Sequence, residues 1–116
     1  MGKVYINENQ ILVSKMIEIY KPYKIDWMSY SITKKNILTF HHIIEVCNGG
    51  KNIISNGALI TKNAHRVLNI LGDRNYLLYE EWNQLFKDIN DSLMPPSEYH
   101  KECSRTLKRY TQRLIY

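Results

Sequence analysis

The chain has 116 residues, of which 44% are hydrophobic and 23% charged, and its formal net charge is +5. This length predicts a single domain with a core of its own, and the composition excludes disordered, collagen-like and coiled-coil chains. No apolar run is long enough to span a membrane and no secretion signal opens the chain, so we expect a cytoplasmic protein without a membrane partner. The only cysteines, Cys47 and Cys103, are expected to be free and buried.

The first predicted element is a helix over residues 8–20. Asn7 and Gln10 have the spacing of a capping box, an apolar helical stripe begins at Ile11, and Pro22 stops it. Residues 23–35 mix aromatic and basic side chains without a period, which indicates irregular structure.

The next segment predicts a strand, a turn, a second strand and a helix. Residues 37–44 are rich in β-branched and aromatic residues, Asn48-Gly49-Gly50 marks a turn, and residues 58–61 form a short second strand. After Thr61, apolar residues recur at helical spacing until Gly72, which we expect to end the helix.

Two further helices are predicted, over about 76–93 and 97–114, separated by Pro95-Pro96. Apolar residues at helical spacing predict one buried face of the helix over 76–93: Leu78, Trp82, Leu85, Ile89 and Leu93. The second is amphipathic, with an apolar side made of Cys103, Leu107, Tyr110 and Leu114. The whole chain therefore predicts an α+β fold in which a short β-hairpin plus helix, about residues 37–72, is embedded in flanking α-helices.

Three of the four histidines, His41, His42 and His65, fall in this strand, turn and helix segment. Neutral imidazole binds Zn, Ni, Co or Mn, and its unperturbed pKa of about 6.5 lets it take a proton near neutral pH. Neighbours on a strand face opposite sides, which favours one ligand and one base in the doublet. We expect the three rings to converge on one ion, as hydrolysis of a phosphodiester would need. The alternative is that they are ordinary polar residues of a strand and a helix.

His41-His42-Ile43, Gly49-Gly50, Asn56 and His65 together resemble the HNH endonuclease motif, the ββα-metal finger, across residues 40–69. The resemblance implies a DNA endonuclease in which His41 and His65 bind one divalent ion and His42 is the general base. It also implies that Asn56 organises the loop. The ion would stabilise the transition state and the leaving oxyanion, and Mg, Mn, Ni and Zn all remain open as its identity. Thr61 and Ala64 occupy the places of one Cys-x-x-Cys pair of many members, so no structural zinc is expected.

One position departs from the pattern: Asn69 stands where some members carry a histidine four residues after the last ligand. A second interpretation is therefore a catalytically weak or inactive HNH-like nucleic-acid-binding module. A third is a metal-binding protein whose basic last helix meets an acidic partner protein. For the endonuclease and for the nucleic-acid-binding module, the expected partner is double-stranded DNA, contacted through its phosphates. The residues expected to make these contacts are Lys62, Arg66, Asn69, Arg105, Lys108 and Arg109.

Overall fold

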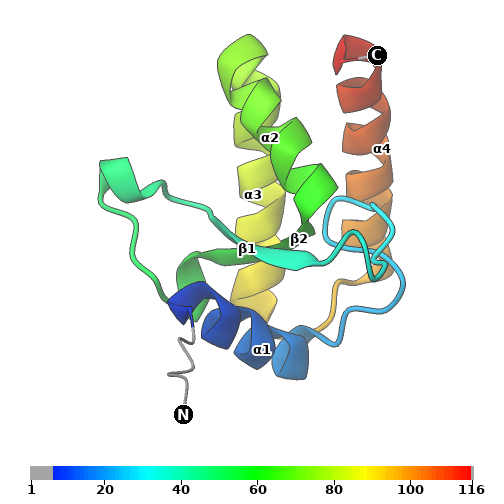
Figure 1. The fold of residues 1–116 in the computed structure, drawn as a ribbon. Coiled ribbons are helices and arrows are strands. Elements are labelled where there is room, and N and C mark those ends of the chain that lie inside the picture. Colours follow the sequence, from blue (N-terminus) through cyan, green and yellow to red (C-terminus); the bar gives the residue numbers. More distant parts are fainter. Residues whose placement is uncertain (1–6, 116) are drawn as a thin grey trace.

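The structure is a computed structural model, and it describes residues 7–115. This part of the chain contains four α-helices and one two-stranded antiparallel sheet, which confirms the predicted α+β class. In chain order the elements are α1 (Glu8–Tyr20), β1 (Leu38–His42), β2 (Gly57–Thr61), α2 (Lys62–Arg74), α3 (Tyr76–Ser92) and α4 (Glu98–Ile115). Figure 1 shows α1 below the sheet, α3 crossing behind it and α4 alongside α3. No helix of the described residues is sufficiently long and apolar to cross a membrane.

The ends of α1 and α2 follow from side chains that cap them. The predicted capping box of Asn7 and Gln10 is present at the start of α1, and Thr61 Oγ1 accepts from Ala64 N at the start of α2. The prediction that Gly72 ends α2 is wrong, because the helix continues to Arg74. Asn75 follows, and its side chain accepts from Leu78 N to start α3, so a single residue separates the two helices.

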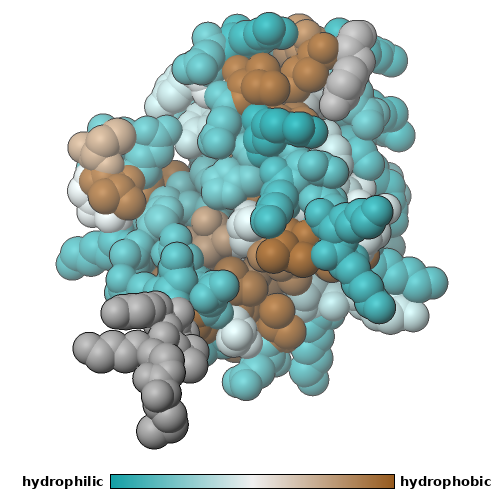
Figure 2. Space-filling model, in the orientation of Figure 1, coloured by the Kyte–Doolittle hydropathy of each residue, from teal (hydrophilic) through white to brown (hydrophobic). Residues whose placement is uncertain are grey.

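The connection between the strands is a loop that contains the predicted turn at Asn48-Gly49-Gly50. The strands pair with Phe40 opposite Leu59, but residues 43–56 form a long loop with two 3₁₀ turns, η1 (Val46–Asn48) and η2 (Ile54–Asn56). Gly49, with φ 88°, ends η1, and a Cβ on Gly50 would overlap the Ile44 carbonyl. The glycines therefore fold the loop back on itself. Figure 2 shows this loop projecting on the left with a hydrophobic patch on an otherwise mainly hydrophilic face.

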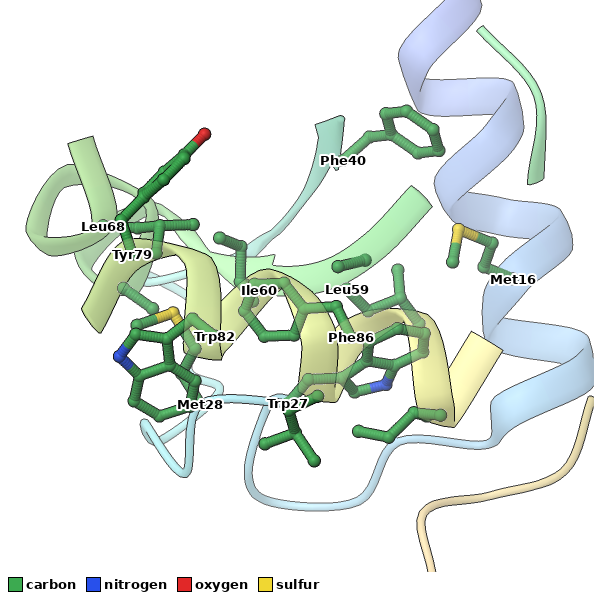
Figure 3. Close-up of a cluster of buried hydrophobic side chains, with 14 of the residues drawn as sticks. Met16, Trp27, Met28, Phe40, Leu59, Ile60, Leu68, Tyr79, Trp82 and Phe86 are labelled. Carbon is green, nitrogen blue, oxygen red and sulfur yellow. The ribbon is translucent and has the colours of Figure 1, made fainter. Parts of the chain in front are cut away.

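The core lies where α3 packs against the sheet and against residues of the irregular segment 21–37. Trp82 and Phe86 of α3 stack with ring centroids 5.9 Å apart (Figure 3). Trp27 lies edge-on to Tyr20, with ring centroids 5.0 Å apart. The predicted buried face of α3 is confirmed except for its last member. Leu93 caps the helix in the left-handed conformation and is 62% exposed, because the chain turns away there.

The contact of α4 with the core agrees only in part with the predicted apolar side: Cys103 and Leu107 pack against the core, but the fully buried residues are small and polar. Its buried residues are Ser104 and Thr111, whereas the expected apolar residues Tyr110 and Leu114 are exposed. Ser104 Oγ donates to the Trp27 carbonyl at 2.9 Å, and Thr111 Oγ1 accepts from Trp82 Nε1 at 2.9 Å. These hydroxyls satisfy polar groups that would otherwise be buried without partners, which is the reason small polar residues face inward.

Both cysteines are free, as expected, but neither is buried. Cys47 is exposed on the loop between the strands, and Cys103 is half-buried on α4. The prediction of two buried thiols is therefore wrong, because Cys47 lies on the projecting loop and Cys103 packs against the edge of the core without being fully covered.

Candidate active site

His41 on β1 and His65 in the second turn of α2 lie side by side. Their ring centroids are 5.4 Å apart and the ring planes are nearly perpendicular, at 88°. Two imidazoles that share one ion through metal–nitrogen bonds of about 2.0–2.1 Å have centroids roughly 5 Å apart. The packing of α2 across the hairpin therefore places these two rings at a separation that suits one shared ion.

The hydrogen bonds of Thr39 fix which nitrogen of His65 carries the proton. The Thr39 hydroxyl has one proton, which it donates to the Ile60 carbonyl at 2.7 Å. Its contact with His65 Nδ1, at 3.1 Å, therefore requires that Nδ1–H donates and Oγ1 accepts. The lone pair of His65 is then on Nε2. A histidine that ligates a metal commonly donates its other N–H to a neighbouring oxygen in this way.

His41 is only 4% exposed, and it hydrogen-bonds Asn83 of α3 between Nε2 and Oδ1 at 2.8 Å. Burial lowers the pKa of His41 from 6.5 to about 4, with smaller contributions from His65 and His42 in the same direction and opposing ones from Asn83 and Glu45. Burial, and to a lesser extent His42, lowers the pKa of His65 as well. Both rings are therefore neutral near pH 7, which is the form that binds a metal.

These lowered pKa values predict that the metal-free protein loses stability in acid. Between pH 6.5 and about 4, His41 takes a proton in the unfolded chain but not in the folded one. The free energy of unfolding should therefore fall by about 3 kcal/mol from this residue as the pH drops through that window. Urea unfolding with a chelator present, at several pH values, measures how the free energy of unfolding changes with pH.

The matched variant for this experiment is His41→Gln, which cannot titrate and can still hydrogen-bond Asn83. Its stability should depend less steeply on pH than that of the wild type, with the remaining slope coming partly from His65. Equal slopes in the two proteins would contradict the buried, neutral state of His41.

His42 points away from this pair. Its ring lies edge-on to Phe40 at 4.9 Å, and Nε2 hydrogen-bonds Asn52 Oδ1 in the loop. Asn52 Nδ2 donates to Glu8 Oε2 at 3.2 Å; because a carboxylate only accepts, the amide oxygen must face His42. His42 therefore carries its proton on Nε2, and the lone pair on Nδ1 is the one that could accept a proton.

The expectation that three imidazoles converge on one ion is not met. Among residues 7–115, no group of three or more His, Cys, Asp or Glu side chains could hold a metal ion. His41 and His42 are neighbours on a strand and face different ways, so only His41 meets His65. An ion held by this pair would complete its shell with water, with substrate oxygens or with a neutral side chain.

Asn56 closes the loop between the strands. Its Oδ1 accepts from Ile44 N at 2.8 Å, and its Nδ2 donates to the carbonyls of Ile44 at 3.0 Å and Lys51 at 3.1 Å. Its backbone carbonyl accepts from Ile43 N at 2.8 Å. The side chain is 8% exposed, so these bonds are sheltered from water. Asn56 therefore holds the segment that directly follows His42.

The residues proposed to contact DNA fall into two groups. Lys62, Arg66 and Asn69 are exposed on α2 at spacings of four and three, which puts them on the flank that also carries His65. On α4, the charges are largely engaged: Lys108 donates to the Ser29 carbonyl at 2.7 Å, and Arg105 pairs with Glu102. Arg109 hydrogen-bonds Thr106 on its own helix. The α2 group is thus the one that lies beside the candidate site.

Asn52 and Asn83 are contacts of the histidines that sequence reasoning missed. Neither lies at a spacing that marks a motif: Asn83 reaches His41 from α3, and Asn52 reaches His42 from the loop between the strands. Comparisons with protein-family models, with curated proteins and with solved structures found no match.

Proposed function

We propose that the protein is a metal-dependent endonuclease of the HNH type, which hydrolyses phosphodiester bonds of DNA. In this proposal β1, β2 and α2 are the ββα-metal finger, and His41 and His65 hold one divalent ion. The observation that carries the proposal is the placement of these two neutral imidazoles 5.4 Å apart, with the lone pair of His65 on Nε2. This pair lies beside the exposed basic flank of α2.

The side chains have distinct roles in the proposed reaction. His42 is half-buried and so accessible to water, and Nδ1 takes a proton from the attacking water. Asn56 keeps the following loop in place, while Lys62 and Arg66 contact backbone phosphates without reading sequence. When bound, the ion would neutralise charge on the phosphoryl oxygens and stabilise the leaving oxyanion. Two imidazoles and open positions fit an ion that must also accept water and phosphate.

The direct test is the nicking of supercoiled plasmid by purified protein with Mn²⁺, Ni²⁺ or Mg²⁺. We expect nicked and then linear product with at least one of these ions, and none once EDTA is added in excess. Restoring the ion should restore cleavage, since the described residues pack around a hydrophobic core.

Plasmid that stays intact with all three ions, while circular dichroism shows a folded protein, would contradict the endonuclease. Cleavage that persists in EDTA would contradict the role of the ion. Parallel reactions with single-stranded DNA and with RNA establish the substrate class.

A second candidate is an HNH-like module that binds nucleic acid with little or no turnover. Two observations favour it: Asn69 is exposed and replaces a possible third imidazole, and the described residues offer only two histidines to one ion. Such a protein would bind DNA without cutting it, and its affinity would fall steeply with salt because phosphate contacts release counterions. An affinity that is unchanged between low and moderate salt would contradict this candidate.

A further inference from the structure

A chain of polar contacts runs from the loop between the strands, through α3, to His41. Glu45 of the loop, Tyr79 and Asn83 of α3, and His41 are its members. Tyr79 Oη donates to Glu45 Oε1 at 2.9 Å, and Asn83 Oδ1 meets His41 Nε2 at 2.8 Å. The Asn83 amide also acts on the Tyr79 hydroxyl as a donor, opposing the rise that burial causes in the pKa of Tyr79. Glu45, Tyr79 and Asn83 line a groove between the loop and α3, and Glu45 is exposed to solvent.

The direction of each hydrogen bond follows from the number of protons available. A carboxylate can only accept, so the single proton of the Tyr79 hydroxyl is directed to Glu45. The Tyr79 oxygen is then an acceptor toward Asn83, which must present its NH₂ group to Tyr79. The amide oxygen of Asn83 is thereby turned to His41. His41 consequently carries its proton on Nε2 and its lone pair on Nδ1.

We infer that Asn83, oriented by Tyr79 and Glu45, is a positioning residue that fixes His41 as a metal ligand through Nδ1. The inference rests on the proposed function, because it assigns a role toward the ion that His41 and His65 would share. Tyr79 and His41 are 5% and 4% exposed, so water cannot easily replace the bonds between them. An N–H of a metal-bound imidazole that donates to a fixed oxygen orients the ring and raises its basicity.

The test combines two measurements on full-length protein: the tautomer of His41 by ¹⁵N NMR without metal, and the affinity for Co²⁺ by its absorption spectrum. Wild type should show the Nε2–H tautomer. Asn83→Leu, which removes the acceptor, should bind Co²⁺ about 10–100-fold more weakly. Asn83→Asp keeps an oxygen opposite Nε2 and should restore affinity. Gln84→Ala, an exposed neighbour in the same groove, is the matched control and should bind like wild type.

Tyr79→Phe tests whether Tyr79 orients the Asn83 amide, and it removes only one oxygen atom from a buried ring. It is also the variant to use if the Asn83 variants fail to fold. The freed amide can then turn over, so His41 should show both tautomers. If the two orientations become equal, the Co²⁺ affinity should fall about twofold.

Each failure is distinct. An Nδ1–H tautomer in wild type, or unchanged Co²⁺ affinity in a folded Asn83→Leu variant, would overturn the positioning role and leave the endonuclease proposal standing. A single Nε2–H tautomer in the Tyr79→Phe variant would overturn the orienting role of Tyr79. A wild-type protein that binds no Co²⁺ would overturn both this inference and the proposed metal site.

Discussion

Replacement of His42 by alanine is expected to lower DNA cleavage by a factor of about 10²–10⁴ while divalent-ion affinity stays unchanged. A loss of this size is expected when the general base that activates a positioned water is removed. Metal affinity should persist because His42 is hydrogen-bonded to Asn52 and lies edge-on to Phe40, whereas the ion would lie between His41 and His65. Plasmid nicking rates and a Co²⁺ titration of the same preparation measure the two quantities.

His100→Ala is the matched control, since His100 is a half-buried histidine on α4 that interacts with Ser97 at the helix start. Its cleavage rate should equal that of the wild type. A His42→Ala variant that cuts at the wild-type rate would reject His42 as the base. A variant that loses Co²⁺ binding would instead place His42 among the ligands, against the geometry of the two rings on β1.

The sequence predicted the elements whose signals are local. The start of α1 was predicted from Asn7 and Gln10, and both hydrogen bonds of that capping box are present. The buried face of α3 was predicted from the spacing of its apolar residues, because helical periodicity depends only on the helix itself. The two strands were also predicted within a few residues, since β-branched and aromatic residues cluster there.

The errors arise where two local signals compete or where a contact comes from far along the chain. Gly72 resembled a helix end, but Asn75 offers a side-chain cap to α3, and α2 runs on to meet it. The polar face of α4 was unpredictable for a different reason. Ser104 and Thr111 face inward to satisfy Trp27 and Trp82, which are distant in sequence.

The candidate site likewise combines residues that a local sequence pattern predicts with partners that come from elsewhere in the chain. The motif spacing selected His41, His42 and His65, and the structure brings His41 and His65 together while His42 faces elsewhere. The partners that fix their tautomers belong to α1, the loop, β1 and α3. Such partners have no sequence pattern, because a hydrogen bond between distant residues requires only that the fold place them in reach. They are nevertheless what decides which nitrogen has a lone pair.

Asp26→Ala is expected to lower the free energy of unfolding by about 3–5 kcal/mol, a large share of the total for a domain of this size. Asp26 is 4% exposed. Its Oδ1 accepts from Met28 N at 2.8 Å and Tyr30 N at 2.9 Å, and its Oδ2 from Thr61 N at 2.7 Å. Alanine would remove the acceptor of all three N–H groups, of which those of Met28 and Thr61 are buried. Urea unfolding at neutral pH measures the loss.

The site depends on this carboxylate because Thr61 caps α2, the helix that carries His65. Burial raises the pKa of Asp26 and the backbone N–H donors oppose that shift, so the carboxylate is compensated by bonds rather than by a cation. Asp26→Asn keeps one oxygen but sets an NH₂ group against a backbone N–H, and should lose less stability than Asp26→Ala. Asp73→Ala, at an exposed aspartate of α2, is the control and should stay within about 0.5 kcal/mol of wild type. An Asp26→Ala variant as stable as that control would show that the irregular segment does not anchor α2 through this side chain.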